Sequence, residues 1–273
     1  MANEAQRTAW TDVSGPTWVR NAATVDRMLG AISDALLASI TAEPGARVLD
    51  VGCGTGTFTA AVAALGTDPV GVDISSTMIE GARARFPDLT FVLADAQVDP
   101  LPGPFDAVVS RFGVMFFDDP VAAFANIGAN CVAGATLDFV CWRSIEHNPV
   151  FAIGTRRLLA ALPSSAPADP LAPGPLAFAD DARLRALLID SGWSAIDIRP
   201  LEATCRFDVG DSDGIDERVE MILSSDSGRR FRAEVPAERQ AEAIAAARAD
   251  LESYIVDGHV EIPGGCWLVR ARR

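Results

Sequence analysis

Residues 47–56 read Arg-Val-Leu-Asp-Val-Gly-Cys-Gly-Thr-Gly, and this stretch decides the fold. A short apolar run at 47–51 leads directly into three glycines at alternate positions, and an Ala-rich helical segment begins at Thr57. A short buried strand followed by a glycine turn and a helix is typical of the first unit of a parallel sheet. The glycines permit turns that other residues avoid, and the first amide groups of the helix can bind an anion.

The exact glycine pattern separates two kinds of ligand. A dinucleotide fingerprint is GxGxxG, whereas the sixth position here is Thr57 and the pattern is GxGxG. Asp50 stands just before the glycines, where a carboxylate would repel a pyrophosphate but can receive an ammonium group. A ligand that carries both an ammonium and a carboxylate, such as the methionyl part of S-adenosylmethionine, matches this pair.

Outward from this stretch, short apolar runs alternate with helical segments. Such alternation predicts a parallel sheet with helices on both faces, and the continuous apolar runs suit strands that are buried on both sides. We expect strands at 47–51, 69–73, 89–93, 105–110 and 135–142, and helices at 16–40, 57–65, 76–86 and 120–131.

The alternation of strands and helices ends after Trp142. We expect a single domain that spans residues 1–273, with its substrate side after this point. Five prolines between 163 and 175 predict a loop or lid. We divide the domain into an N-terminal helical lid (1–44), a cofactor-binding core (45–142) and a substrate-side half (143–273). In the last part we expect a helix at 180–190, a strand at 195–207, a helical cap insertion at 208–260 with a helix at 236–255, and a final strand at 265–271.

Two further acids end apolar runs. Asp73 ends the second predicted strand and Asp95 follows the third. The carboxyl ends of parallel strands meet at one edge of a sheet, and open α/β sheets bind ligands in the crevice there. An acid at Asp73 can accept hydrogen bonds from ribose hydroxyls, and an adenine amino group would lie near Asp95.

The runs VLDVGCGTG (48–56), GVDIS (71–75) and LADA (93–96) resemble, in order and spacing, the class I S-adenosylmethionine-dependent methyltransferases. The resemblance is to their small-molecule branch, related to the ubiquinone/menaquinone methyltransferases. It implies a Rossmann-like α/β fold with a seven-stranded, mostly parallel sheet of order 3-2-1-4-5-7-6, in which strand seven is antiparallel, with helices on both faces and a helical cap. It also implies S-adenosylmethionine as cofactor, S-adenosylhomocysteine as product, and no metal.

Site residues follow from the same resemblance, position by position. Asp50 and the glycine turn would hold the methionyl group, Asp73 the ribose, and Asp95 the adenine edge, while Trp18, with Trp10 beside it, would close over the cofactor. The full set of implied cofactor residues is Trp18, Asp50, Gly52, Cys53, Gly54, Gly56, Asp73, Ile74, Met78, Asp95, Ala96, Arg111 and Phe112.

The acceptor side is less specific. Met115 and Phe116 could line an apolar acceptor pocket, although the same side chains could equally pack in the core. Arg143 and His147 follow the fifth predicted strand, where substrate loops gather in this fold. An oxygen or carbon nucleophile usually needs a base, and His147 is the candidate. The alternative for His147 is an ordinary loop histidine.

Composition and charge exclude several classes of partner. The chain has 273 residues, a formal net charge of −14, and 23 cationic side chains that are all Arg. Without a basic run, a surface that tracks the phosphates of nucleic acid is not expected. Without Lys, Schiff-base chemistry and Walker-type phosphate binding are excluded.

The five cysteines are widely spaced and form no CxxC pair, so neither a zinc site nor a dithiol motif is expected. No apolar stretch is long enough to span a bilayer, and the first residues lack the apolar core of a signal peptide. We therefore expect a cytoplasmic protein without a membrane span. The sequence does not indicate its oligomeric state.

The residues favour methyl transfer to an O, N or C nucleophile of a small organic molecule. Ser110-Arg111-Phe112-Gly113 does not match the tetrapeptide of adenine-methylating enzymes, which agrees with the acidic charge. Two alternatives remain open at this point. One is a protein that binds S-adenosylmethionine without catalysing transfer, and the other is a nucleotide-dependent oxidoreductase.

Overall fold

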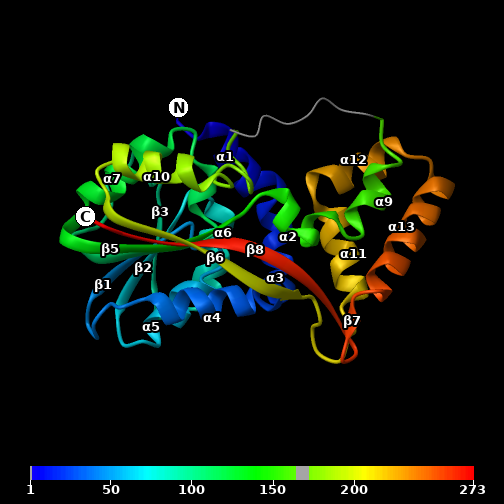
Figure 1. Ribbon diagram of the computed structural model, residues 1–273, viewed down its shortest axis with the longest axis horizontal. Helices are drawn as coiled ribbons and strands as arrows, with labels where there is room; N and C mark the ends of the chain where they lie inside the picture. The colour runs from blue at the N-terminus through cyan, green and yellow to red at the C-terminus, as the bar shows by residue number, and fades with distance from the viewer. Residues whose placement is uncertain (1, 164–171) are drawn as a thin grey trace.

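A computed structural model describes residues 2–163 and 172–273 (Figure 1). Its strands form one mixed sheet of order β3-β2-β1-β4-β5-β8-β6, with β7 paired only to β8. The strands are β1 (Arg47–Val51), β2 (Asp68–Asp73), β3 (Thr90–Leu93), β4 (Phe105–Arg111), β5 (Cys131–Trp142), β6 (Ser194–Arg206), β7 (Ile255–Val256) and β8 (His259–Arg272).

The sheet confirms the predicted topology. Strands β1 to β5 pair in parallel, and β8 runs antiparallel between β5 and β6. Strand β8 takes the place of the predicted strand seven, and the number shifts because the two-residue β7 precedes it. The apolar runs explain the central position of β1 and β4, since Val48, Leu49 and Val108 are fully buried.

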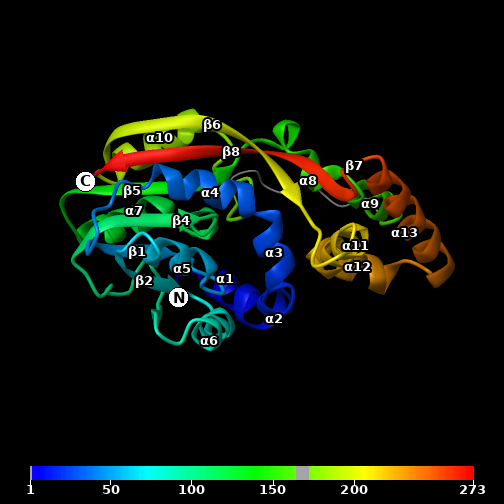
Figure 2. The same cartoon turned by 90° about the horizontal axis from the view of Figure 1, so that it is seen from below.

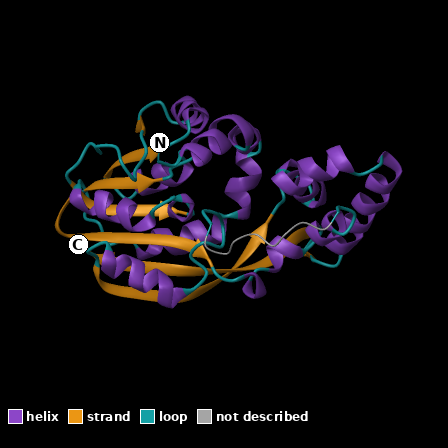
Figure 3. Ribbon diagram, turned by 90° about the horizontal axis from the view of Figure 1, so that it is seen from above, coloured by secondary structure: helices purple, strands orange, loops and turns teal. Residues whose placement is uncertain are grey.

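Helices cover both faces of the sheet, as predicted. Figure 1 shows α7 and α10 on one face and α4 and α5 on the other, and Figure 3 shows the same layering from above. No helix in the described ranges is long and apolar enough to cross a membrane. The helices that flank the sheet are α4 (Gly30–Ser39), α5 (Thr57–Ala63), α6 (Ser76–Arg85), α7 (Pro120–Ala129) and α10 (Asp181–Asp190).

The N-terminal segment corrects one expectation. A single helix over 16–40 is wrong, because the backbone leaves the helical range at Asn21 (ψ 19°) and at Leu29 (ψ 3°). Gly30 directly follows the second break and favours it. The helical pieces of this segment are α1 (Glu4–Thr8), a π-helical turn at Ala9–Val13, α2 (Gly15–Arg20), α3 (Ala22–Met28) and α4. The breaks let α2 pack on α6 while α3 runs toward β6.

Strands β6 and β8 continue beyond the rest of the sheet as a long antiparallel pair that reaches a separate group of helices (Figure 2). We call α9, α11, α12 and α13 the cap helices. The helical elements of the cap and of the segment that leads to it are the 3₁₀ turn Ile145–His147, α8 (Pro149–Ala152), α9 (Thr155–Leu159), α11 (Ile215–Ser224), α12 (Asp226–Glu234) and α13 (Ala237–Glu252). A further 3₁₀ turn, Val114–Phe116, follows β4.

Two boundaries in this half differ from expectation. The last predicted helix ends at Glu252, and Ile255 lies exposed in β7 rather than on a helix face. Strand β8 begins at His259, well before the predicted start at 265, so Gly264 lies inside the strand. A Cβ on Gly264 would come within 3.2 Å of Trp142 and Cys205. That glycine therefore serves close packing inside a strand rather than a turn. Most of the predicted proline-rich loop, 164–171, lies outside the described residues.

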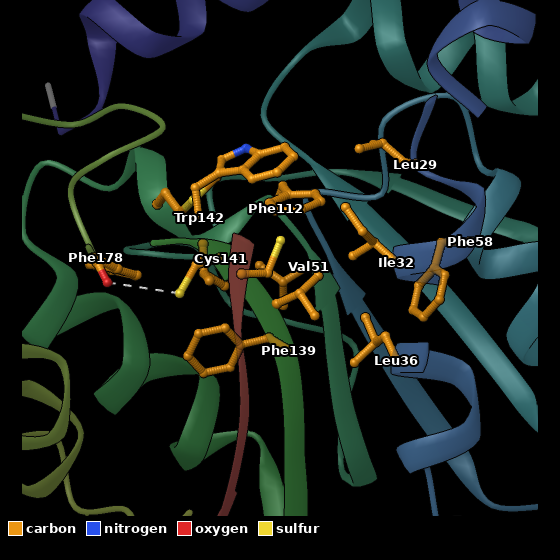
Figure 4. Close-up of a cluster of buried hydrophobic side chains, with 14 of the residues drawn as sticks. Leu29, Ile32, Leu36, Val51, Phe58, Phe112, Phe139, Cys141, Trp142 and Phe178 are labelled. Atoms are coloured by element: carbon orange, nitrogen blue, oxygen red, sulfur yellow. Dashed lines mark hydrogen bonds between the residues drawn. The ribbon is translucent and has the colours of Figure 1, made fainter. Parts of the chain in front are cut away.

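The core beneath the strand ends is drawn in Figure 4. Ile32 and Leu36 of α4 lie on one side, and Phe139 of β5 is fully buried near them. Above them, Phe112 and Trp142 stack with ring centroids 4.3 Å apart and planes 17° from parallel. This packing fixes the ends of β4 and β5, from which the next features project.

Candidate active site

A cavity of about 540 Å³ opens at the carboxyl ends of the strands. This volume lies within the range of small-molecule sites. Its wall has three main parts: the strand ends, the N-terminal helices, and a cap side to which α8 and α11 contribute. Side chains from these parts include Asp50, Asp73, Asp95, Trp10, Trp18, Met28, Leu29, Phe151, Arg218, Met221 and Ile222.

The glycine turn after β1 forms the floor of the cavity. Gly52, Gly54 and Gly56 all have positive φ angles, of 68°, 53° and 82°. A Cβ on Gly52 would lie 2.6 Å from Gly113 Cα, so this residue must be glycine for the two turns to meet. A Cβ on Gly54 would meet nothing within 4 Å, because that position faces open space. Gly56 packs instead against Phe91, behind the cavity wall.

Asp50 is buried at the end of β1 with one oxygen unpaired. Its Oδ2 accepts a 2.6 Å hydrogen bond from Thr59 Oγ1, and Oδ1 has no partner among residues 2–163 and 172–273. Burial raises the pKa of Asp50 to about 6, against the lowering effects of the Thr59 hydrogen bond and of the Arg111 charge. A buried carboxylate oxygen without a donor, on the wall of a cavity, indicates a place for a cationic donor.

Asp73 ends β2 and is held by backbone amides. Its Oδ2 accepts from Gly54 N and its Oδ1 from Ser75 N, each at 2.9 Å. Burial raises the pKa of Asp73, while the amides of Ser75 and Gly54 act in the opposite direction. These bonds fix the direction of the carboxylate and leave further lone pairs on both oxygens for a ligand.

Asp95 follows β3 and completes the row of acids. Its Oδ1 accepts from Asn3 Nδ2 at 2.8 Å and from Gln97 N at 3.0 Å. Its Oδ2 is buried and has no partner in the described part of the chain. The three acids therefore stand at the ends of three neighbouring strands, and two of them present an unsatisfied oxygen.

The turn after β4 brings Arg111 and Phe112 to the cavity. Arg111 donates to Ser33 Oγ at 3.0 Å and lies 3.6 Å from Asp26 Oδ1. Phe112 has a φ of 63°, which is unusual for a residue with a side chain and is held by its stacking on Trp142. Strained backbone of this kind is frequent at binding sites.

Aromatic side chains of the N-terminal segment cover the adjacent part of the cavity. Trp10 packs edge-on against Trp18 and Phe116, with centroids 5.4 and 5.1 Å apart. The segment is anchored to α6, because Ser75 Oγ donates to Trp10 O and Thr77 Oγ1 donates to Thr11 O, both at 2.8 Å. Trp18 remains 36% exposed and so forms a border between cavity and solvent.

Comparison with known proteins shows the family to which the chain belongs. A model described as a methyltransferase domain matches residues 48–134. A demethylmenaquinone methyltransferase of Renibacterium salmoninarum is 33% identical over 172 residues, which are 60% of this chain and 73% of that protein. The chain belongs to the class I S-adenosylmethionine-dependent methyltransferases.

Two solved structures share the fold of this methyltransferase. The YcgJ protein of Bacillus subtilis superposes with a TM-score of 0.56 at 16% identity, over 88% of this chain and 97% of that one. The phosphoethanolamine N-methyltransferase 2 of Haemonchus contortus, in complex with S-adenosylmethionine, gives a TM-score of 0.51 at 17% identity. It is matched over 88% of this chain and 52% of its own.

Most residues that the sequence assigned to the cofactor line the cavity of the methyltransferase. Gly56 is the exception, since it packs behind the wall. Met115 and Phe116, expected near the acceptor, line it as well. The cofactor positions at the wall are Trp18, Asp50, Gly52, Cys53, Gly54, Asp73, Ile74, Met78, Asp95, Ala96, Arg111 and Phe112.

His147 and Arg143, expected near the acceptor, are not among the residues that line the cavity. Arg143 forms an ion pair with Glu202 and lies over the ring of Trp267, 4.8 Å from its centroid. His147 Nε2 is 3.0 Å from Arg143 Nη2. The loop is held in this position by Asn148, which exchanges two 2.9 Å hydrogen bonds with the backbone of Gly265.

Several residues at the site were not found from the sequence, and Asn3 and Arg218 are two of them. Asn3 lies in a stretch without apolar periodicity, and only its contact with Asp95 gives it a role. Arg218 carried a usable signal, because it stands among the apolar positions Ile215, Val219 and Ile222 of one helix. A cation within an apolar helical face is unusual and indicates a buried charge.

Proposed function

We propose that the cavity binds S-adenosylmethionine along the three strand ends, and that the enzyme transfers its methyl group to an O, N or C nucleophile of a small organic molecule. The observation that carries this proposal is the pair of buried, unpaired carboxylate oxygens, Asp50 Oδ1 and Asp95 Oδ2, on one cavity wall. They need donors that the described residues do not supply. The ammonium and adenine amino groups of this cofactor are such donors.

The residues present fit the cofactor in detail. Asp50 would take the methionyl ammonium, and the open space at Gly54 would admit the methionyl backbone against the turn. Asp73, fixed by two amides, would accept from the ribose hydroxyls. Asp95 Oδ2 would accept from adenine, beside Ile74 and the other apolar residues of that part of the wall.

When bound, the cofactor supplies a methyl group that is already activated by its sulfonium. The protein therefore has to position and to exclude water rather than to generate an electrophile. Trp10, Trp18 and Phe116 form the aromatic border that would exclude solvent, and we propose residues 1–44 as the lid over the cofactor. No histidine of the described residues lines the cavity, so we do not assign a histidine base.

A small organic acceptor is supported by the form of the cavity and by the named relative. The acceptor part of the wall includes the apolar residues Met28, Leu29, Phe151, Met221 and Ile222, which suit an apolar molecule of limited size. The same side also carries Arg218 and the polar residues Ser224, Ser225 and Asp226. The relative from Renibacterium salmoninarum is named for methyl transfer to demethylmenaquinone, a small molecule.

Calorimetric titration of the full chain tests the cofactor assignment. We expect one S-adenosylhomocysteine to bind per chain and NAD not to bind, and the opposite result would support an oxidoreductase instead. A labelled-methyl assay over phenols, amines, quinols and oxo acids then tests catalysis. Binding without transfer to any of these classes would favour a protein that only holds the cofactor.

A further inference from the structure

Arg218 of α11 stands on the cap side of the cavity, opposite the acidic strand ends. Its side chain lines the cavity, yet the residue is only 7% exposed. It lies over the ring of Phe207, with Cζ 5.1 Å from the centroid. A cation in this position must be compensated, because a buried unpaired charge is costly.

The compensation found in the structure is incomplete. Arg218 Nη2 donates to Val150 O, and lies 3.4 Å from both Ile153 O and Thr155 Oγ1. All three acceptors are neutral, and no carboxylate within the described ranges forms an ion pair with Arg218. Nε is buried without an acceptor. Nη1 has no acceptor in the described chain either and, unlike Nε, is not fully buried.

The other arginine of the wall differs in this respect. Arg111 Nη2 lies 3.6 Å from Asp26 Oδ1, and the negative charges of Asp26 and Asp50 both act to raise the pKa of Arg111 against the effect of burial. Among the described residues Arg218 has no such partner, and the titratable neighbour that acts on it there is the thiol of Cys205. Burial lowers the pKa of Arg218 to about 10, so the guanidinium remains charged at neutral pH. A positive charge is therefore held at the cavity, and no carboxylate in the described part of the chain forms an ion pair with it.

The surroundings of Arg218 define the rest of the ligand. Met221 and Ile222 follow it on α11, and Phe151 lies on the adjoining wall. A molecule bound to Arg218 in the cavity would lie against these apolar side chains. It therefore needs an apolar body and one acidic end.

We propose that Arg218 anchors the methyl acceptor through a carboxylate, so that the acceptors of this enzyme are organic acids with an apolar body. A guanidinium N–H forms a strong charge-assisted hydrogen bond with a carboxylate, and Nη1, which has no acceptor among the described residues, is the donor that would bind it. This inference rests on the proposed function of the same cavity. The competing explanation is a structural arginine whose only task is to bind the carbonyls of Val150 and Ile153.

Matched acids and amides separate these explanations without any mutation. The probes are 4-hydroxybenzoate and 3-(4-hydroxyphenyl)propanoate, each compared with its primary amide of nearly equal volume. They are titrated into the wild-type chain saturated with S-adenosylhomocysteine. We expect the acids to bind at least about tenfold more tightly than the amides, because a charged hydrogen bond is lost in the amide.

Arg218→Met then tests the residue, with Arg248→Met as the matched control. Arg248 is a cap arginine that pairs with Asp216 on α11 but does not line the cavity. We expect Arg218→Met to lose the preference for acids while its affinity for S-adenosylhomocysteine stays within twofold of wild type. Arg248→Met should keep both properties.

Three outcomes overturn the proposal. Equal binding of acids and amides by the wild type, or no binding of any acid to the loaded protein, contradicts it even if Arg218→Met fails to fold. Retention of the acid preference in a folded Arg218→Met also contradicts it. Failure of the wild type to bind S-adenosylhomocysteine is a different result, because it overturns the proposed function on which this inference rests.

Discussion

On the strand-end wall, Asp73 and Asp95 are bound by backbone amides, whereas on the cap wall Arg218 is bound by backbone carbonyls. The amides of Ser75 and Gln97 come from only two residues beyond the acids they bind. The carbonyl of Val150 is 68 residues from Arg218. Local turns therefore supply part of the bonding of the first wall, whereas the bond from Arg218 to Val150 forms only in the assembled fold.

Substitutions in the glycine turn should disturb the strand-end wall most strongly. Gly52→Ala should destabilise the protein by about 3 kcal/mol or more, because a left-handed backbone is combined with a collision against Gly113. Gly54→Ala has the same backbone strain but free space, and should cost only about 1–2 kcal/mol. Urea unfolding of both variants measures the difference, and equal losses would contradict this reading of the turn.

Asp50→Asn separates stability from binding on the same wall. The folded pKa of about 6 lies above the ordinary value of 3.8, so Asp50 favours folding below pH 4 and loses that contribution as the pH rises through 6. The variant should therefore stabilise the cofactor-free protein at pH 7.5 by up to about 3 kcal/mol. It should also weaken S-adenosylhomocysteine binding by about a hundredfold.

Thermal unfolding at pH 4.5 and 7.5, together with calorimetry, measures both effects of Asp50→Asn. Asp68→Asn is the control, because Asp68 is exposed at the opposite end of the neighbouring strand. Wild-type affinity for S-adenosylhomocysteine should also fall below pH 6, where a proton competes for Asp50. Affinity that does not change between pH 5 and 7.5 would argue against an ionic role for this carboxylate.

Asp73→Ala should weaken S-adenosylhomocysteine binding at least tenfold, because the carboxylate fixed by Gly54 and Ser75 loses its contact with the ribose. Asp88→Ala, an exposed acid in the loop before β3, is the matched control. Calorimetry at pH 7.5 is the measurement. An unchanged dissociation constant for Asp73→Ala would refute the ribose assignment.

His147→Ala is expected to have the smallest effect. The side chain lies against Arg143 and outside the cavity wall, so turnover with any acceptor should stay within about twofold of wild type. Steady-state kinetics measures this for each acceptor that the labelled-methyl assay finds. A large loss in kcat with little change in KM would mean that His147 reaches the acceptor after all.

The strand-end half of the fold could be predicted because its information is local. The apolar runs that lead to Asp50 and Asp73 mark buried parallel strands, and the run before Asp95 marks the partly exposed parallel strand at the edge of the sheet. The alternation of strands and helices then restricts the topology to few possibilities. The breaks at Asn21 and Leu29 escaped prediction, since the apolar spacing continues across them and only packing on α6 and β6 favours the bends.

The cap half of the site could not be predicted for the opposite reason. Whether His147 faces the cavity depends on Asn148 and Gly265, which meet only once β8 has joined the sheet. The compensation of Arg218 likewise comes from a distant loop. Residue type alone favoured His147 as the chemically active group. In the structure Arg218 stands out instead, because its Nε is buried without an acceptor among the described residues.

The position of β8 has a consequence for folding during synthesis on the ribosome. Strand β8 pairs Trp142 of β5 with Cys266, and the whole cap is encoded between these two residues. A nascent chain can assemble β1 to β5 while β8 is still unmade, and during that time β5 presents an open edge to other chains. The time taken to translate the cap therefore sets how long that edge must be protected.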